Sequence, residues 1–324
     1  MRSTKAILGA LLLAAVTLAG CGTTEKPSGG SPENTGAPVT VTDSRGKTVR
    51  LPHTAKRVVA TEWNAVEDLV SLGVMPVGVA DPKGYGQWVS AAPLKGAVTD
   101  IGTRGEPSLD TLMSLAPDLV VVTEGLPESA LAQIEAKLPV VVIKGGDLKD
   151  SIGTMFHGLN TIATATGTGK RATQLKSEFD AKLAEDRKAV EGLGANGEKV
   201  AFADAYVASG TVTIRPYTKG SQVSEVFARL GLDNPWPMTG DPAYGLGKAD
   251  VEGLTRLPDA RFWYSANDSE GDPFTEELAN NAIWKGLPFV KNGKVQRLPD
   301  SLWMFGGPKS MQQYADAAVA ALKK

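Results

Sequence analysis

The chain has 324 residues, of which 42% are hydrophobic and 22% are charged, a composition typical of folded globular proteins and not of disordered, fibrous or multispanning membrane proteins. Its 34 basic and 36 acidic residues leave no excess of positive charge that would indicate a nucleic-acid partner. With a single cysteine and two histidines, His53 and His157, disulfide frameworks and thiolate zinc sites are excluded, and a transition-metal site built from protein ligands is disfavoured.

The first residues are predicted to be a targeting segment. Arg2 and Lys5 precede an apolar run over 6–18 that is too short to span a membrane, so residues 1–20 are interpreted as a signal peptide. The string from Leu18 to Cys21 resembles a bacterial lipobox, which implies lipidation of Cys21 and an anchor on the outer face of the cell membrane. Residues 21–38, rich in Gly, Ser, Thr and Pro, are predicted to form a flexible tether. The alternative is a plain secretory signal.

Residues 39–166 show the alternation of strands and helices that is typical of an α/β lobe. Predicted helices cover 65–72, which Gly73 would end, and 108–116. Short runs rich in β-branched residues predict strands at 57–60, 76–80, 119–122 and 138–143. This order favours a parallel sheet with helices on its faces.

A largely helical stretch follows, with a break at Gly167-Thr168-Gly169. Residues 170–191 contain no Gly or Pro and predict a helix of about 33 Å, which Thr168 would cap. We interpret residues 167–193 as a rigid connection between two lobes. The segment is not read as a phosphate-binding loop, because Thr164 stands where that motif needs glycine and no Ser or Thr follows Lys170.

Residues 194–324 repeat the order of the first half. A strand is predicted at 200–203 and a helix at 223–230, and the string 250–259 resembles 108–118: each has a carboxylate on the first helical turn, spaced leucines and Pro-Asp before a strand. Either an internal duplication or a sequence pattern that is common to helix-to-strand connections in general explains this match. The predicted fold is α/β, with two Rossmann-like lobes of mostly parallel sheets joined by a long rigid helix.

Aromatic residues in loops are the strongest pointer to a site. No nucleophile, base or metal motif is present, so we expect no enzyme and no cofactor. Loops at the carboxyl ends of parallel strands are where such folds bind ligands, so the aromatic residues together predict a concave pocket, although each alone could plug a core. Arg104 precedes a predicted helix and is either a pocket cation or a surface ion pair. The aromatic residues are Trp63, Tyr85, Trp88, Trp236, Tyr244 and Trp303.

Several strings together resemble the FhuD-like ferric hydroxamate siderophore-binding lipoproteins, which are class III substrate-binding proteins of ABC importers. The similarity runs from Arg57 to Tyr314. The matching strings are 57–63, 72–81, 88–90, 101–107, 234–236, 284–290, 296–299 and 302–307.

The resemblance implies a receptor outside the cytoplasm that binds an iron(III)-siderophore complex and delivers it to a permease. It places Arg104 against the iron-bound hydroxamate oxygens, with Trp236 and Trp303 walling the groove. A forked donor and broad aromatic walls suit a compact, nearly neutral chelate whose iron needs no protein ligand. Trp63, Trp88 and Tyr244 are further expected ligand contacts, and a monomer is expected.

Two departures from the family pattern leave the ligand open. Thr123-Glu124-Gly125 stands where the family has a tyrosine, and Phe305 stands where the family has a second tyrosine near the end of the chain. Contacts near the iron are then expected to shift toward Arg215 or Tyr244. Arg215 and Tyr217 are predicted to lie in a polar loop that could supply another donor.

The resemblance also assigns Asp110 and Glu252 to docking. It pairs acidic residues at these positions with arginines of the permease, one on each lobe. The alternative is that both carboxylates only stabilise helix N-termini.

Rival ligand classes remain at this point. Receptors for catecholate or citrate chelates, haem or cobalamin share the expected plan, but strongly anionic chelates call for several pocket cations, and Arg104 and Arg215 are the good candidates. A zinc or manganese receptor needs three or four protein ligands. A siderophore esterase needs a nucleophile and base that the sequence does not present.

Overall fold

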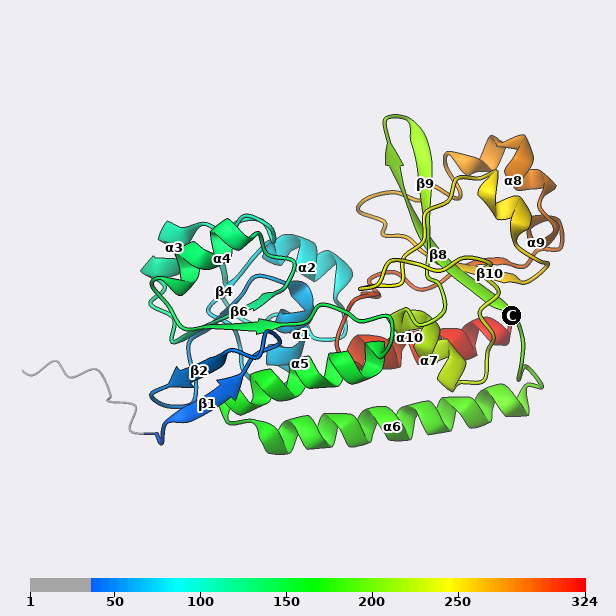
Figure 1. Cartoon of the computed structure of the whole chain (residues 1–324). Helices are drawn as coiled ribbons and strands as arrows, with labels where there is room; N and C mark the ends of the chain where they lie inside the picture. Colours follow the sequence, from blue (N-terminus) through cyan, green and yellow to red (C-terminus); the bar gives the residue numbers. More distant parts are fainter. Residues whose placement is uncertain (1–35) are drawn as a thin grey trace, which may run out of the picture. The chain divides into compact units, whose positions relative to one another are not determined.

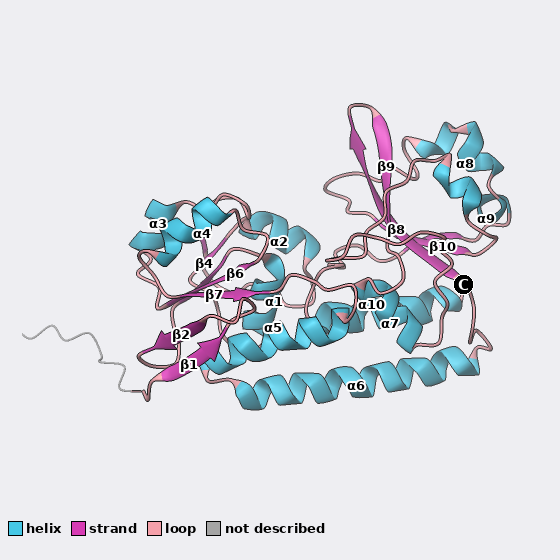
Figure 2. Cartoon of the chain, in the orientation of Figure 1, coloured by secondary structure: helices cyan, strands magenta, loops and turns pink. Residues whose placement is uncertain are grey.

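The computed structural model describes residues 36–324, and Gly36–Lys324 form one compact unit. The predictions for the signal peptide, for Cys21 and for most of the tether lie outside the described residues. Within this unit the chain forms two sheets with helices packed around them, together with a small N-terminal hairpin of β1 (Val39–Thr42) and β2 (Thr48–Leu51) (Figures 1 and 2).

The N-terminal lobe is built on a parallel sheet. Its strands are β3 (Val58–Ala60), β4 (Gly78–Val79), β5 (Thr99–Asp100), β6 (Leu119–Thr123) and β7 (Val140–Ile143). They lie in the order β5-β4-β3-β6-β7, and every pair is parallel. The central strands β3 and β6 are buried throughout, which explains their unbroken β-branched runs.

Four helices accompany this sheet, and their ends follow local chemistry. Gly73 has φ of +84° and follows the last turn of the first helix, as predicted. The Ser108 hydroxyl accepts a hydrogen bond from Thr111 N and caps the N-terminus of the third helix, which begins at Leu109. The helices are α1 (Trp63–Ser71), α2 (Pro82–Trp88), α3 (Leu109–Ser114) and α4 (Glu128–Glu135).

Two consecutive helices lead to the C-terminal lobe. These are α5 (Ser151–Thr166) and α6 (Gly169–Gly192), separated at Gly167, whose φ is +73°. The prediction of a long helix is confirmed, and its 24 residues correspond to about 36 Å. The cap is different from the one expected, because the Thr168 hydroxyl pairs with the Thr166 hydroxyl and caps no backbone N–H.

The helix α6 packs against α5 and against two helices of the C-terminal lobe, α7 (Gln222–Arg229) and α10 (Pro308–Leu322) (Figure 1). The buried residues of α6 recur at helical spacing and form a stripe along the face that makes these contacts. The buried residues of the stripe are Ala172, Leu175, Phe179, Leu183, Asp186 and Val190. The largest hydrophobic cluster includes this stripe and residues of both lobes, so a packed core joins the lobes.

The C-terminal lobe has a different sheet. Its strands are β8 (Val200–Ala208), β9 (Thr211–Pro216), β10 (Arg261–Ser265) and β11 (Val295–Arg297), in the order β11-β10-β8-β9. The pairs β10·β8 and β10·β11 are parallel, whereas β8 and β9 form an antiparallel hairpin. Arg215 and Pro216 therefore belong to a strand, which corrects the predicted polar loop.

The helical turns expected in the string 250–259, from its match with 108–118, are also corrected. Only a single 3-10 turn forms there, η1 (Gly253–Arg256), and Glu252 precedes it. The two sequence strings that look alike thus form different structures, although the Asp250 side chain accepts from Gly253 N at the same spacing at which Ser108 accepts from Thr111 N. The remaining short elements are η2 (Leu278–Asn280), α8 (Ala282–Gly286) and α9 (Pro288–Lys291).

Candidate functional site

A cavity of about 550 Å³ lies between residues of the two lobes. The N-terminal lobe contributes segments that follow its parallel strands: Glu62 to Asn64 follow β3, Arg104 follows β5, and Thr123 ends β6. Because the carboxyl ends of parallel strands share one edge, segments far apart in the sequence meet here. The C-terminal lobe contributes Arg215, Tyr244, Leu246, Glu270, Trp303, Met304 and Phe305.

A connected row of aromatic rings forms part of this wall. Trp303 lies at the centre, with ring centroids 4.8 Å from Trp63, 5.9 Å from Trp88 and 5.3 Å from Phe305. Tyr244 continues the row at 5.3 Å from Phe305. Trp63 is itself held by its indole N–H, which donates to Ala80 O. The row crosses from the first lobe to the second and offers broad apolar contact area.

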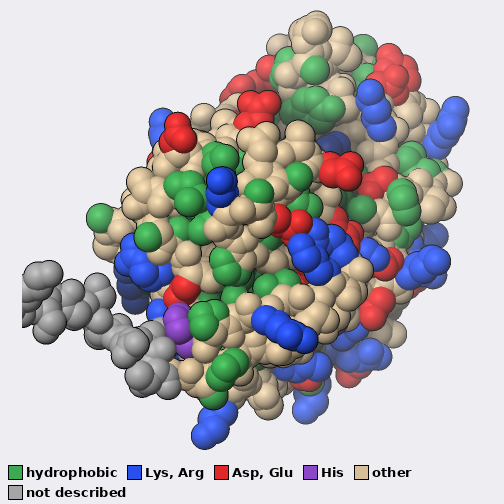
Figure 3. All heavy atoms as spheres, turned by 60° about the vertical axis from the view of Figure 1, so that its left-hand side comes forward, with side chains coloured by type: hydrophobic (Ala, Val, Ile, Leu, Met, Phe, Trp, Pro, Cys, Tyr) green, Lys and Arg blue, Asp and Glu red, His purple; other side chains and the backbone are tan. Residues whose placement is uncertain are grey.

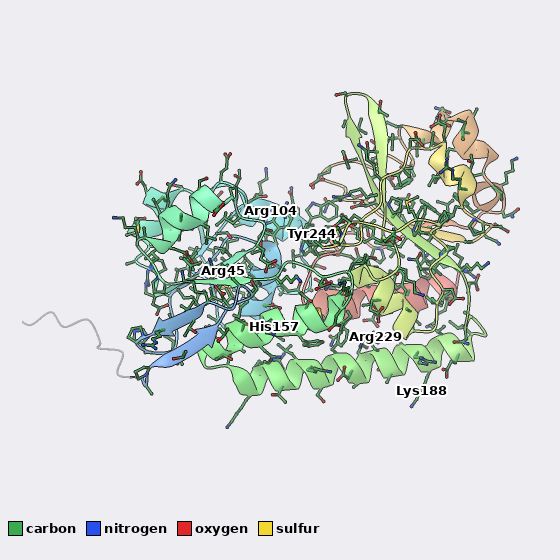
Figure 4. The ribbon with its side chains drawn as sticks, viewed as in Figure 1. Arg45, Arg104, His157, Lys188, Arg229 and Tyr244 are labelled. Carbon is green, nitrogen blue, oxygen red and sulfur yellow. The ribbon has the colours of Figure 1, made fainter. Side chains whose placement is uncertain are left out.

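Arg104 lies over this aromatic row. Its guanidinium carbon is 4.1 Å from the centroid of Trp63 and 5.6 Å from that of Trp303, and its side chain is 38% exposed. The loop that carries it turns at Gly102, whose φ is +100°. Figure 4 shows Arg104 from the N-terminal lobe and Tyr244 from the C-terminal lobe on facing sides of the two lobes.

Glu62 is the carboxylate nearest to Arg104. The contact between Arg104 Nη1 and Glu62 Oε2 is long, 3.5 Å. Burial raises the pKa of the Glu62 carboxyl, and the positive charge of Arg104 opposes this rise. Arg104 therefore keeps most of its hydrogen-bonding capacity for a molecule in the cavity.

Arg215 is held much more firmly. Its Nε donates to Asp204 Oδ1 at 2.7 Å, its Nη2 donates to Asp204 Oδ2, and the Tyr217 hydroxyl donates to the same Oδ2 at 3.2 Å. Burial raises the pKa of the Asp204 carboxyl, and the hydrogen bonds and charge of Arg215 counter this effect. The guanidinium is thus fixed in one orientation at the wall of the cavity.

Two predicted contact residues do not line the cavity. Trp236 is 7% exposed, packs on Phe262 in the core of the C-terminal lobe, and donates its indole N–H to Phe202 O. Tyr217 is 1% exposed and reaches Asp204. Both are corrections to the expected groove. Tyr85, an aromatic residue in the predicted pocket, is also buried, with its hydroxyl on Ala92 O.

The other predicted residues meet at the cavity, and the structure adds several that sequence reasoning missed. Trp63, Trp88, Arg104, Arg215, Tyr244, Trp303 and Phe305 all line it. The additions with polar side chains are Glu62, Asn64, Thr123 and Glu270. The position of Thr123 at the end of a buried strand was the available signal. No sequence signal pointed to Glu270. Its carboxylate accepts a hydrogen bond of 2.7 Å from the Trp88 indole N–H.

The cavity is balanced in formal charge. Two arginines, Arg104 and Arg215, and two glutamates, Glu62 and Glu270, contribute to its lining. Acidic, basic and apolar side chains are also interspersed over the face of the molecule in Figure 3. Between residues 36 and 324, no group of three His, Cys, Asp or Glu side chains is placed to hold a metal ion.

Asp110 and Glu252 are both exposed. Asp110 lies in the first turn of α3, as expected, whereas Glu252 stands before the 3-10 turn η1.

Across the described part of the chain, no helix combines the length and the apolar character that a membrane span requires.

Two α/β lobes around a ligand-sized cleft define a solute-binding receptor of the class III type. The family model described as periplasmic binding protein matches residues 58–302. The chain therefore belongs to this family, whose members are transport receptors that act outside the cytoplasm and are not enzymes.

Curated relatives agree with this membership. The chain is 28% identical to the Fe(3+)-citrate-binding protein YfmC of Bacillus subtilis over 96% of its own length and 94% of the relative's. It is 27% identical to the iron(3+)-hydroxamate-binding protein FhuD of Escherichia coli, over 80% of its own length and 84% of the relative's.

Solved structures are similar as well. The siderophore-binding protein FhuD of Vibrio cholerae, bound to Fe3+-Desferal, has a TM-score of 0.72 and 26% identity, and the match covers 82% of this chain and 97% of that one. The triscatecholate siderophore-binding protein FeuA of Bacillus subtilis has a TM-score of 0.72 at 20% identity, covering 88% and 98%, and supports the fold.

Proposed function

We propose that this protein binds an iron(III)-siderophore complex of the hydroxamate type and delivers it to the permease of an ABC importer. The observation that carries the proposal is the combination of an aromatic row with a charge-balanced lining in a cavity of about 550 Å³. A ferric hydroxamate occupies all iron positions with its own oxygens and presents a compact, nearly neutral surface. Such a ligand needs apolar walls and a few well-placed donors, and it needs no cofactor.

Arg104 is the proposed donor to the iron-bound oxygens. Its planar guanidinium rests on Trp63, and its one long contact with Glu62 leaves N–H groups available. A forked donor can bridge two neighbouring ligand oxygens, whereas a lysine ammonium acts as a point charge. Trp63, Trp88, Trp303, Phe305 and Tyr244 supply the apolar contact, and only Tyr244 among them carries a hydroxyl that can replace the one absent from Phe305.

A ferric citrate ligand is the second candidate, because a relative with 28% identity is named for it. Its complexes are anionic and require cationic partners. In this cleft one arginine is paired with a buried aspartate, and Glu270 adds a negative charge. The structure of the cleft thus favours the hydroxamate class over the citrate class.

Intrinsic tryptophan fluorescence tests the proposal, since Trp63, Trp88 and Trp303 line the cavity. Titration with iron-loaded hydroxamate, citrate and catecholate chelates and with their iron-free forms should show saturable quenching that is strongest for ferric hydroxamates. Saturable binding of a ferric catecholate or citrate alone would contradict the ligand class. Absence of binding by every iron chelate would contradict the function.

Delivery is proposed to use Asp110 and Glu252, one exposed carboxylate on each lobe. Reversing both charges, Asp110→Lys with Glu252→Lys, should abolish uptake of the labelled ferric siderophore by cells while the purified protein keeps its affinity. The alternative helix-end role contributes roughly 0.3–1 kcal/mol to stability and predicts normal uptake. A matched control reverses Asp180 and Glu191, two exposed carboxylates of α6.

The anchor is proposed to be an acylated Cys21, and the receptor to act as a monomer on the outer face of the cell membrane. Two or more acyl chains hold a protein stably at a membrane. Cys21→Ala should release the protein or leave it unprocessed. Mass spectrometry of the mature N-terminus measures this, and an unmodified terminus at another residue would contradict the anchor.

A further inference from the structure

The pair formed by Asp204 and Arg215 has a geometry that concerns ligand choice. The two residues are directly opposite each other on β8 and β9, so their side chains share one face of the hairpin. The Asp204 side chain is 4% exposed, whereas that of Arg215 is 36% exposed and lines the cleft. One partner is thus an interior group and the other presents its outer edge to a ligand.

Both carboxylate oxygens of Asp204 are committed. Oδ1 accepts from Arg215 Nε, and Oδ2 accepts from Arg215 Nη2 and from the Tyr217 hydroxyl. This two-point contact uses one edge of the guanidinium and fixes its plane, which leaves the two N–H groups of Nη1 and the second N–H of Nη2 as the donors available to a ligand. Tyr217, almost fully buried, prevents the carboxylate from turning away.

The pairing also determines the electric field in the cleft. A negative charge in direct contact with Arg215 cancels most of its attraction for an anion several ångströms away, since the two fields nearly offset each other at that distance. Arg104 differs, because its contact with Glu62 is single and 3.5 Å long. With Asp204 counted, three carboxylates, Glu62, Glu270 and Asp204, accompany the two arginines of the cleft.

We infer that Asp204 is a specificity-determining residue: it holds Arg215 in an ion pair with no net charge that still donates hydrogen bonds, so that the receptor accepts neutral ferric chelates and rejects anionic ones. This inference rests on the proposed function. Asp204 does not touch the ligand and acts through Arg215, which makes it a positioning residue as well.

The test compares two probes, ferrichrome as a neutral ferric trihydroxamate and ferric dicitrate as an anionic chelate. Dissociation constants are measured by tryptophan fluorescence for the wild type and for Asp204→Asn, which keeps the shape and an oxygen for Arg215. We expect the ratio of the ferric dicitrate constant to the ferrichrome constant to fall about tenfold or more in the variant, because the charge of Arg215 is uncovered. A ratio that stays within about twofold of the wild type would overturn the inference.

Two further variants keep the result interpretable. Asp272→Asn removes another buried carboxylate of the same lobe, whose polar partners are Tyr264, Phe274 N and Arg297 and not Arg215, and its ratio should match that of the wild type. Arg215→Lys retains a cation beside Asp204, so the ratio should stay within about threefold even if ferrichrome binds more weakly. If Asp204→Asn does not fold, this second variant decides: a tenfold fall of its ratio would contradict cancellation by Asp204.

Failure of the inference is distinguishable from failure of the proposed function. If the wild type binds ferrichrome tightly and Asp204→Asn leaves the ratio unchanged, the receptor function stands and the role of Asp204 falls. If the wild type binds neither probe nor any other ferric hydroxamate, the proposed function itself is contradicted.

Discussion

The two walls of the cleft each present an arginine, and they hold it in different ways. Arg104 of the N-terminal lobe lies on the aromatic rings of Trp63 and Trp303 and has one long contact with Glu62. Arg215 of the C-terminal lobe is clamped by both oxygens of a buried aspartate. Their exposed fractions, 38% and 36%, are nearly the same. The exposed fraction therefore does not tell which arginine is available to a ligand. The acidic partner of each arginine, Glu62 or Asp204, determines this.

The same contrast applies to the buried acids. In the C-terminal lobe, Asp204 is fully paired. In the N-terminal lobe, Glu67 and Asp68 are adjacent and buried on α1. Glu67 accepts from the backbone and hydroxyl of Ser310 on α10, whereas Asp68 Oδ1 has no hydrogen-bond partner among residues 36–324. One lobe neutralises its buried charge, and the other carries an unsatisfied group at its junction with α10.

The largest expected effect separates a core tryptophan from a cleft tryptophan. Trp236→Ala should lower the free energy of unfolding by about 3–5 kcal/mol, because it leaves a large void beside Phe262. The affinity of the folded fraction for ferrichrome should remain near that of the wild type. Urea unfolding and fluorescence titration measure the two quantities.

Trp303→Ala is the matched variant for the cleft and should weaken ligand binding. If Trp236→Ala instead weakens binding with stability intact, Trp236 belongs to the site and its assignment to the core is wrong.

Arg104→Ala should weaken binding of the ferric hydroxamate by about 2–4 kcal/mol, since it removes charge-assisted hydrogen bonds to the iron-ligating oxygens. Arg104→Lys should recover only part of this loss, because lysine cannot present a fork. Arg187→Ala, on the exposed surface of α6, is the control for loss of an arginine. Unchanged affinity in Arg104→Ala would remove the N-terminal wall from the proposed mechanism.

Asp68→Asn should make the protein more stable at neutral pH, by about 1–3 kcal/mol. Burial, and next the charge of Glu67, raise the pKa of the Asp68 carboxyl well above its ordinary value. The folded state therefore favours the protonated form, and wild-type stability falls as the pH rises from the unfolded pKa of Asp68 toward its folded pKa.

Urea unfolding at about pH 5 and about pH 8 checks the sign of this effect. The stability difference between Asp68→Asn and the wild type should be larger at the higher pH. A larger gain at the lower pH would show that Asp68 is stabilised as an anion, contrary to its unpaired environment.

The smallest effect is expected at the hydrogen bond between Trp88 of the N-terminal lobe and Glu270 of the C-terminal lobe. Trp88→Phe keeps an aromatic ring but removes the indole N–H that donates to Glu270. Because this contact is exposed, binding of ferrichrome should weaken by less than about 1 kcal/mol. A loss as large as that of Arg104→Ala would assign Trp88 a direct polar contact with the ligand.

Sequence reasoning located much of the lining because loop position is readable from a pattern. Trp63 follows a strand of β-branched residues, and Arg104 follows Gly102 just before a capped helix, so both could be placed at one sheet edge. Their roles in ligand binding stay predictions. Trp236 follows a proline in an apparent loop in the same way, yet its ring turns inward. A local pattern cannot report the direction of a ring, because that depends on which volume the rest of the lobe leaves unfilled.

The sequence by itself determined the α/β class, the parallel strands β3, β4, β6 and β7 of the N-terminal lobe and the long helix α6, because these depend on local periodicity and on Gly, Pro and capping residues. The match between 108–118 and 250–259 shows the limit of such patterns, since one string forms α3 and the other a 3-10 turn. Only the tertiary structure decided that Arg215 lies on a strand opposite Asp204 and that Tyr217 supports the pair from within. The physical reason is that strand register and burial bring together residues that lie eleven and more positions apart in the sequence. The net charge of the pair they form, which neither residue shows by itself, determines what the cleft presents to a ligand.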